Sequence, residues 1–239
     1  MPVFFTRNID TAAGRAAIEG EDARHLSLSL RVRPGEALTV SDGEGTAYDG
    51  VIAAVGRERV EVSIREGYPS LGEPSVRLTL FQALCKGEKF ETIVQKAVEL
   101  GVSEIVPVLT ERCVSRPDEK SFARKRERYE RIALAAAGQC GRGRIPSVGP
   151  LRRLEEVGGT LDGALFFYER AVRPLHSVPV DGRKELSLIV GAEGGFSPEE
   201  AAFIEAAGAL PVSLGGRILR CETAPIAALA ALLYAVGDF

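Results

Sequence analysis

The sequence LSLIVGAEGGFSPEE, residues 186 to 200, decides the fold class. It begins with an apolar run of strand length and bends at three glycines. Ser197-Pro198-Glu199-Glu200 then has the signature of a helix start, with a capping serine and a glutamate three residues later. We expect a buried strand at 186–190, a glycine loop, and a helix from 198 to about 207. A strand followed by a helix is the repeating unit of a mainly parallel α/β sheet.

The same alternation extends to both sides of this stretch. Apolar runs predict strands at 76–84, 105–109, 164–168 and 210–214. Helical spacing of apolar residues predicts a helix at 90–98, and a second one that Ser121 caps and that the glycines at 138, 141 and 143 end. A last helix at 225–236 is apolar nearly all round, so we expect it to be buried against the core or a second subunit.

The first part of the chain has a different pattern. Short apolar stretches separated by turn signals predict a small β-rich domain over residues 1–72, with strands at 38–40, 47–54 and 59–64. Residues 21–30 are expected to form a short helix that carries His25. The segment 66–74 has two glycines and two prolines and is the expected linker. The α/β domain then covers residues 73–239.

Composition limits the function classes. The chain has 239 residues, of which 45% are hydrophobic and 26% charged, which is typical of a globular protein. It shows no leader peptide and no apolar run near the about 20 residues that cross a bilayer, so a soluble, cytoplasmic protein is expected. The four cysteines are widely spaced and only two histidines are present, so we expect reduced thiols and no metal.

Charge is unevenly distributed. The net charge of −3 argues against a generally basic surface for nucleic acid. Residues 112–144, however, include ten Lys or Arg against four acidic residues. This segment is either a solvated helix face with ion pairs or a local RNA-binding patch.

Two glycine loops are candidates for a ligand site. The loop at 191–195 matches neither the phosphate loop nor the dinucleotide fingerprint, because no lysine follows and its glycines are spaced differently. It is either a tight turn or a ligand cradle. The run LGGRILRCETA, residues 214 to 224, follows another expected strand and holds Arg217, Arg220 and Glu222. Such charges are costly to bury unless they pair with each other or with a ligand, and Thr223 is also a candidate helix cap.

Several motifs in family order resemble the RsmE family of ribosomal RNA methyltransferases. They are KGEKFE (86–91), QKAVELGV (95–102), ERC (111–113), QCGR (139–142), RIP (144–146) and the two glycine loops. The N-terminal part fits through His25, Leu30-Arg31, Gly35 and Asp42-Gly43. The chain has Ala192 and Gly216 where the family commonly has proline, which makes the loops more flexible.

The resemblance implies a SPOUT-type, trefoil-knotted α/β domain with a PUA-like β-barrel before it. It implies methylation of N3 of a uridine in 16S ribosomal RNA of the small subunit, with S-adenosyl-L-methionine as the cofactor. It also implies a homodimer and no need for metal. The implied catalytic residues are Arg220 and Glu222. The implied cofactor-binding residues are Tyr168, Glu169, Ile189, Val190, Gly191, Glu193, Gly194, Gly195, Leu214, Gly215, Ile218, Leu219 and Thr223. The candidate RNA-binding residues are Arg7, Arg24, Arg31, Arg33, Arg124, Arg142 and Arg144.

Two alternatives stay open at this point. One is a SPOUT methyltransferase that acts on another RNA or on a ribose 2′-hydroxyl, because cofactor loops are similar across the class. The other is a non-catalytic PUA-like RNA-binding or ribosome assembly protein. The segment 139–146 favours the RsmE reading over the first, and the presence of both Arg220 and Glu222 favours catalysis over the second.

Overall fold

The structure, a computed structural model, describes residues 2–239 and divides into two compact units. The first unit comprises residues up to Glu73 together with Leu134–Ile145, and the second comprises Pro74–Ala133 and Pro146–Phe239. Helix α3 (Glu119–Cys140) contributes to both units. No helix within residues 2–239 has the length and apolar character needed to span a membrane.

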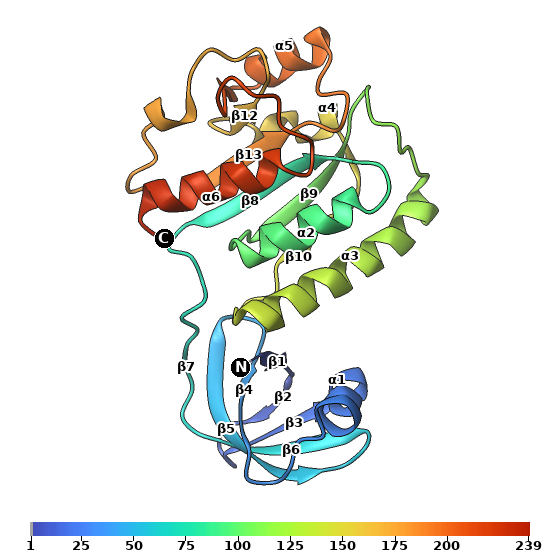
Figure 1. Cartoon of the computed structure of the whole chain (residues 1–239), viewed down its shortest axis with the longest axis vertical. Helices are drawn as coiled ribbons and strands as arrows, with labels where there is room; N and C mark the ends of the chain where they lie inside the picture. The colour runs from blue at the N-terminus through green and yellow to red at the C-terminus, as the bar shows by residue number, and fades with distance from the viewer. Residues whose placement is uncertain (1) are drawn as a thin grey trace. The chain divides into compact units, whose positions relative to one another are not determined.

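The first unit is built on a seven-stranded sheet (Figure 1). Its strand order is β1-β4-β5-β6-β3-β2, with β7 paired to β5, and all pairs except β1 with β4 are antiparallel. A short helix α1 and one π-helical turn follow β3. The strands are β1 (Val3–Phe5), β2 (Asn8–Asp10), β3 (Arg15–Glu19), β4 (Ala37–Ser41), β5 (Thr46–Val55), β6 (Arg59–Ile64) and β7 (Tyr68–Pro69). The helical segments are α1 (Gly20–Arg24) and the π-helical turn His25–Leu30.

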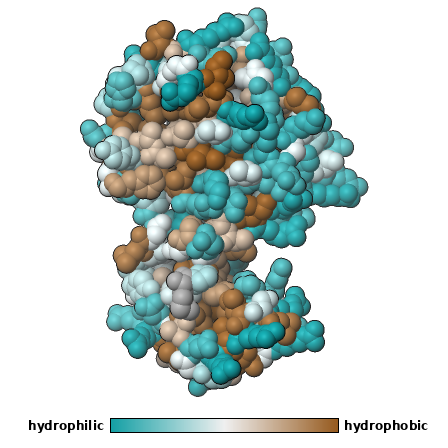
Figure 2. All heavy atoms as spheres, in the orientation of Figure 1, coloured by the Kyte–Doolittle hydropathy of each residue, from teal (hydrophilic) through white to brown (hydrophobic). Residues whose placement is uncertain are grey.

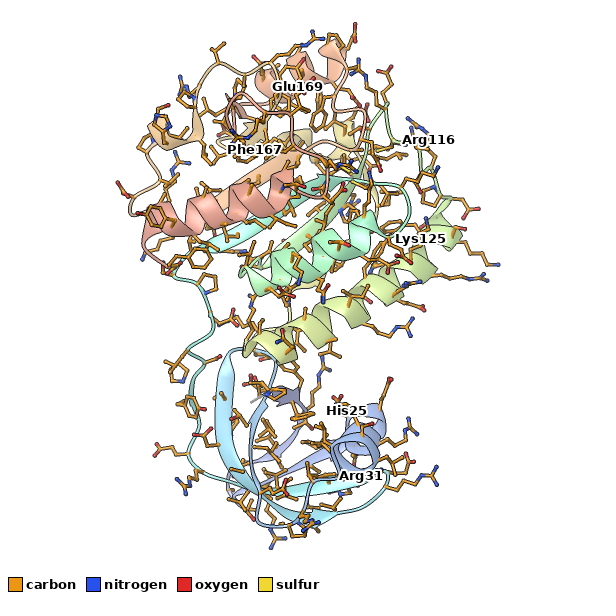
Figure 3. All side chains as sticks on the ribbon, viewed as in Figure 1. His25, Arg31, Arg116, Lys125, Phe167 and Glu169 are labelled. Carbon is orange, nitrogen blue, oxygen red and sulfur yellow. The ribbon has the colours of Figure 1, made fainter. Side chains whose placement is uncertain are left out.

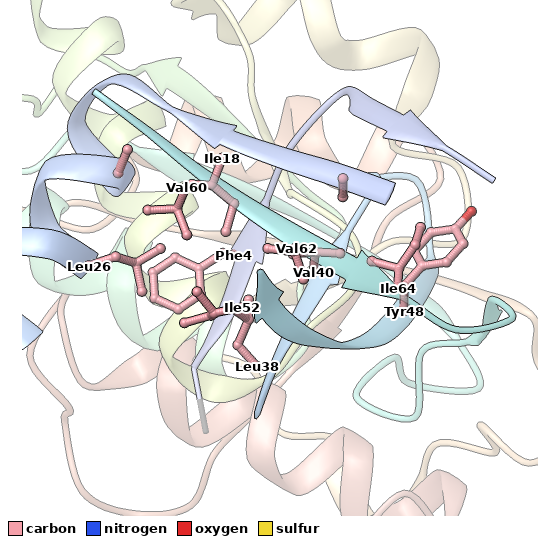
Figure 4. Packing of buried hydrophobic residues seen from close by; sticks show 12 residues of the cluster. Phe4, Ile18, Leu26, Leu38, Val40, Tyr48, Ile52, Val60, Val62 and Ile64 are labelled. Carbon is pink, nitrogen blue, oxygen red and sulfur yellow. The ribbon is translucent and has the colours of Figure 1, made fainter. Parts of the chain in front are cut away.

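Alternating side chains of these strands form the core of the first unit. In β6 the buried positions are Val60, Val62 and Ile64, with exposed residues between them, as the two-residue period of a strand requires. Figure 4 shows them packed with Phe4 of β1 and Leu26 of the π-helical turn. Each such side chain removed from water contributes about 1.5–3 kcal/mol, so this small unit depends on a tightly filled interior.

The second unit contains a seven-stranded, entirely parallel sheet. The strand order is β10-β9-β8-β13-β12-β14, with β11 also paired to β9. Helices α2 and α6 pack together in front of the sheet in Figure 1, while α4 and α5 share a core with the other side of β12 and β13. The strands are β8 (Arg77–Ala83), β9 (Glu104–Leu109), β10 (Ser147–Val148), β11 (Arg152–Arg153), β12 (Leu165–Phe167), β13 (Glu185–Val190) and β14 (Leu210–Val212). The α-helices besides α3 are α2 (Lys89–Glu99), α4 (Leu154–Val157), α5 (Pro198–Ala206) and α6 (Ala224–Val236).

The predicted α/β class and the start of α5 are confirmed. Ser197 Oγ accepts a hydrogen bond from the Glu200 amide, and the Glu200 carboxylate accepts one from the Ser197 amide, so the capping box is complete. The helix predicted at 90–98 is also present as α2, and Gly101 adopts a φ of 90° just past its end, the left-handed conformation with which many helices end.

The prediction for the start of α3 was wrong. The helix begins at Glu119, and the Asp118 side chain accepts a hydrogen bond from the Ser121 amide at 2.6 Å, so Asp118 rather than Ser121 caps it. At its other end the helix continues through Gly138 to Cys140, and Gly141, one of the three predicted glycines, follows it with a φ of 83°. A Cβ at Gly138 would lie 2.7 Å from the carbonyl oxygen of Val3, so this glycine permits the helix to pack closely against β1.

Arg142 also differs from its prediction as an RNA contact. Its side chain is only 3% exposed and pairs with the Glu73 carboxylate at 2.8 Å. Glu73 also accepts hydrogen bonds from the backbone amides of Gly143 and Arg144, at 3.0 and 2.9 Å. A buried guanidinium with a carboxylate partner is unavailable to a phosphate group, so Arg142 has a structural role here.

Replacement of Glu73 by Ala should therefore destabilise the first unit strongly. The substitution leaves the Arg142 charge buried without this partner and removes the acceptor of two backbone amides. Breaking a buried ion pair from one side costs about 3–5 kcal/mol. Urea unfolding followed by circular dichroism measures the loss. Glu66→Ala, at an exposed position of the same segment, is the matched control and should change stability little. A loss below about 1 kcal/mol in Glu73→Ala would contradict this role.

Candidate functional site

Three loops of the second unit lie side by side because the three neighbouring strands before them end at paired residues. Phe167 of β12 lies opposite Val190 of β13 on one side and opposite Val212 of β14 on the other. The strands are parallel, so the loops that follow them leave the same edge of the sheet. They enclose a cavity of about 550 Å³, and Figure 3 shows Phe167 and Glu169 in this region. The cavity is lined by Lys89, Phe167, Tyr168, Glu169, residues 190–196, residues 212–221 and Ala224.

The loop at 191–196 is a tight turn whose backbone borders the cavity. The Gly195 amide donates a hydrogen bond to the Ala192 carbonyl at 3.0 Å. Gly195 has a φ of +63°, and a Cβ there would lie 3.4 Å from the Glu169 carboxylate. The tight-turn reading of the sequence is thus correct, and it does not exclude the ligand reading. The same absence of side chains leaves backbone groups open to a bound molecule.

The loop at 213–221 carries apolar side chains that the protein does not cover. Ser213 Oγ accepts a hydrogen bond from the Gly215 amide at 3.1 Å, and Gly215 has a φ of +104°. Beyond this turn, Ile218 is 88% exposed although it borders the cavity. An apolar side chain beside a cavity gains stability when a ligand with an apolar face covers it.

Lys89 joins two carboxylates that come from different loops. Its Nζ lies 3.3 Å from Glu193 Oε1 and 3.5 Å from Glu222 Oε2. Glu193 Oε1 also accepts a hydrogen bond from the Lys86 amide at 3.0 Å, and Glu222 Oε2 accepts one from the Cys221 thiol at 3.2 Å. The start of α2 is thereby connected to both loops at the cavity.

These contacts lower the pKa of both carboxyl groups. Partial burial pushes the pKa of Glu193 upward, but hydrogen bonds from its own amide and that of Lys86, together with Lys89, hold it below the ordinary value. The pKa of Glu222 is lowered mainly by a hydrogen bond from its own amide, and further by Cys221 and Lys89. Glu222 is consequently an acceptor of hydrogen bonds rather than a proton reservoir.

Arg220 is exposed and borders the cavity. Among residues 2–239 it forms no ion pair, and the alternative of a structural Arg220–Glu222 pair is wrong because Glu222 pairs with Lys89. Its carbonyl accepts hydrogen bonds from the amides of Thr223 and Ala224, at 2.8 and 2.9 Å. The backbone of Arg220 thus starts helix α6, while its side chain stays available.

Most of the predicted cofactor-binding residues line the cavity, and two do not. Ile189 is buried in the core shared with α4 and α5, because neighbouring strand residues point to opposite faces of the sheet. Thr223 is exposed at the start of α6 and lies outside the cavity lining. Those that line it are Tyr168, Glu169, Val190, Gly191, Glu193, Gly194, Gly195, Leu214, Gly215, Ile218 and Leu219.

Lys89, Phe167, Phe196 and Cys221 border the cavity but were absent from the prediction. For Lys89 a signal existed, because it lies in the motif at 86–91 that the resemblance uses. Phe196 is buried, and its ring contacts that of Phe166 edge to face at 5.2 Å between centroids. It therefore also anchors the loop at 191–196 to β12.

The remaining predicted RNA-binding residues are exposed on the surface. Arg24 pairs with Glu58 at 3.1 Å, an exposed contact that a phosphate group can replace. Figure 3 shows Arg31 in the first unit, where it has a φ of 51° just after the π-helical turn. The exposed residues are Arg7, Arg24, Arg31, Arg33, Arg124 and Arg144.

Comparison with known proteins gives matches over nearly the whole chain. A model of the RNA methyltransferase domain matches residues 72–233, and a model of the RNA methyltransferase PUA domain matches residues 18–65. Ribosomal RNA small subunit methyltransferase E of Mycobacterium bovis is 30% identical over 96% of this chain and 90% of its own.

Two solved structures are similar along their full length. The crystal structure of ribosomal RNA small subunit methyltransferase E from Neisseria gonorrhoeae, bound to S-adenosyl methionine, has a TM-score of 0.91 and 32% identity, covering 100% of this chain and 99% of the other. A putative methyltransferase from Legionella pneumophila in complex with the same cofactor has a TM-score of 0.90 and 33% identity, covering 99% and 98%. The predicted α/β domain with a PUA-like domain before it is confirmed.

Replacement of Lys89 by Met should raise the pKa of both Glu193 and Glu222. The substitution removes the ammonium that lies between them and keeps a side chain of similar length. Carbon-13 NMR titration of the two carboxyl groups measures the shift. A carboxyl group whose pKa is lowered on folding stabilises the protein above its unfolded-state pKa, and this stabilisation is lost as the pH falls. Lys89→Met removes part of this stabilisation, so the variant should lose less stability on acidification. Lys86→Met, an exposed neighbour, is the control, and unchanged titration in Lys89→Met would refute the contact.

Proposed function

Because this chain belongs to the ribosomal RNA small subunit methyltransferase E family, we propose that it methylates N3 of a uridine in 16S ribosomal RNA with S-adenosyl-L-methionine as the cofactor. The single observation that carries this proposal is the cavity at the ends of β12, β13 and β14, where the glycine loops, Arg220 and the Lys89 network come together. A substrate in the ribosomal subunit also supports a cytoplasmic location.

The cavity fits the proposed cofactor in size and in chemistry. Its volume lies within the range of about 300–1,000 Å³ that is usual for small-molecule sites. Leu214, Ile218 and Leu219 offer an apolar surface for the adenine ring, and the glycine backbones at 191–195 and 215–216 offer amides and carbonyls for its polar groups. When bound, S-adenosylmethionine supplies an activated methyl group, so the protein mainly has to position the acceptor.

The acceptor nitrogen needs help, because the N3 imide of uracil is protonated at neutral pH. We assign to Arg220 the role of stabilising negative charge that develops on the uracil oxygens as that proton leaves. Its exposure at the cavity and its lack of an ion pair within the described chain support this role. Glu222, held ionised, is suited to accept a hydrogen bond from N3–H and to orient the base.

We assign RNA binding to the domain formed by residues 1–72 and to basic residues of the segment 124–144. Residues 18–65 of this domain match the RNA methyltransferase PUA model. Because residues 1–72 carry more acidic than basic side chains, a local basic patch has to make the RNA contacts. We propose that Arg7, Arg24, Arg31, Arg33, Arg124 and Arg144 contact phosphate groups, and we withdraw Arg142. Contacts of this kind position the RNA without reading its bases.

A homodimer is the second part of the proposal. Helix α6 buries Ala228, Leu229, Leu232 and Leu233 against the second unit, yet Tyr234 on another face is 75% exposed. Figure 2 shows apolar residues gathered over α6 on the visible face. An apolar surface that remains after the helix has packed is suited to a two-fold contact.

Light scattering at micromolar concentration should give twice the 25.5 kDa chain mass. Tyr234→Glu should shift the particle toward the monomer, because the substitution buries a charge in the contact. Glu199→Gln, on an exposed residue of α5, is the control. A monomeric wild-type protein that methylates RNA would exclude this part of the proposal.

Three functions are separated by one series of measurements. Binding of S-adenosylmethionine without methyl transfer to unmodified small-subunit RNA would favour a non-catalytic assembly protein. Transfer with a product other than 3-methyluridine, identified by mass spectrometry of digested RNA, would favour the alternative of another RNA target or a ribose 2′-hydroxyl. Formation of 3-methyluridine is the result that we expect.

Arg220→Ala should depress single-turnover methylation by about 10²–10³ while changing cofactor affinity and melting temperature little. The reason is that the proposed charge on uracil appears only near the transition state. Arg220→Lys keeps the charge without the two-pronged geometry and should recover part of the rate. Normal turnover in a stable Arg220→Ala variant would remove Arg220 from the mechanism, and a large loss of stability would make its role structural.

A further inference from the structure

Two cysteines that are far apart in the sequence meet beside the Lys89 network. The Sγ atoms of Cys85 and Cys221 and a carboxylate oxygen of Glu193 all lie within 4.8 Å of one another. Cys85 follows β8, Glu193 lies in the glycine loop after β13, and Cys221 precedes α6. Both thiols are buried, with 3% and 7% exposure. Cysteine spacing along the chain gave no sign of this group.

A second carboxylate lies beside Cys221. Glu222 Oε2 lies 3.2 Å from Cys221 Sγ. Lys89 Nζ lies 3.8 Å from Cys221 Sγ and contacts both carboxylates. Without a bound cation, its ammonium therefore supplies the positive charge between Glu193 and Glu222. The Lys89 side chain is 35% exposed, and its flexible stem allows the ammonium to leave for solvent.

The ligand set is one that a soft divalent cation prefers. Thiolates bind Zn²⁺ at about 2.3 Å and carboxylates at about 2.0–2.2 Å, in tetrahedral geometry. Neighbouring ligand atoms of such a tetrahedron are about 3.4–3.8 Å apart. The present separations of up to 4.8 Å differ from this by about an ångström, which small side-chain rotations supply.

We propose that Cys85, Cys221 and Glu193 form a binding site for a soft divalent cation, Zn²⁺ or Cd²⁺, with Glu222 as the fourth ligand. On binding, both thiols lose their protons to solvent, two sulfur–metal bonds form, and the Lys89 ammonium leaves the site. No oxidant or reductant is needed. The proposal stands independently of the methyl transfer, because it rests on binding alone.

Protonation makes the site dependent on pH. Both thiols are buried and the cation binds only their deprotonated form, so each thiol has to give up its proton. Cation binding must displace that proton and therefore strengthens as pH rises. Occupancy would also withdraw Glu193, Glu222 and Lys89 from their present contacts at the cavity, so a bound cation would hinder a ligand there.

The test is titration of the reduced full-length chain with Cd²⁺ without oxygen, followed by ultraviolet thiolate-to-metal charge-transfer absorption. We expect one Cd²⁺ per chain. Cys85→Ser and Cys221→Ser should each weaken binding at least about 100-fold, since even indirect loss at metal sites costs about 10–100-fold. Cys140→Ser is the matched control because this cysteine is exposed and belongs to the other compact unit, and the variant should bind as the wild type does.

Lys89→Met distinguishes a cation site for which the ammonium competes from two thiols that merely lie near each other. If the ammonium competes for the site, its removal should tighten Cd²⁺ binding, whereas a purely supporting role of Lys89 predicts weaker binding. Absence of the charge-transfer band, equal affinity in the Cys85→Ser and wild-type chains, or weaker binding in Lys89→Met would each overturn the proposal. The proposal would also be overturned if two thiols became unreactive in a thiol titration while no metal was bound, because that result identifies a disulfide.

Discussion

The register of β12 between its two parallel neighbours is the constraint on which the site depends. Leu165 pairs with Leu188 and Leu210, and Phe167 pairs with Val190 and Val212. A shift of one residue would turn Phe166 to the opposite face of the sheet, away from the core that it shares with α4 and α5, and would misalign both neighbouring loops. Phe166 is fully buried and stacks on Tyr168 at 5.1 Å between ring centroids, so the core fixes the register and the register fixes the cavity.

Electrostatics then hold together what the register has aligned. Glu193 and Glu222 belong to loops that approach each other, and two ionised carboxylates would repel without a cation between them. Lys89 supplies that cation from the first turn of α2, and the Lys86 amide adds a neutral donor to Glu193. One ammonium therefore serves both carboxylates and links the two loops to the start of α2.

The sequence was sufficient where the signal is local. Apolar runs and the Ser197 capping box predicted the parallel sheet and α5, because strands and caps depend on neighbouring residues. The three short strands β1, β2 and β3 were not predicted individually, because their pairing is set by distant partners such as β4 and β6. The Arg142–Glu73 pair and the Cys85–Cys221 contact were invisible for the same reason. Charge and spacing do not reveal which side chains meet after folding.

This chain has no proline at two loop positions, 192 and 216, where the family commonly has one. Other contacts replace the lost rigidity at Ala192 but not at Gly216. In the loop with Ala192, three backbone carbonyls accept hydrogen bonds: that of Ala192 from the Gly195 amide, that of Gly191 from Gln82 Nε2, and that of Gly194 from Arg112 Nη1. Ala192 itself is 6% exposed, so packing replaces the rigidity of a proline.

At Gly216 the surroundings are open, because a Cβ there would have nothing within 4 Å, and the neighbouring Arg217 is exposed. The second loop therefore keeps the freedom that its glycines give it. Ordering of that loop over a ligand must come from contacts that the ligand itself makes, above all with the uncovered side chain of Ile218.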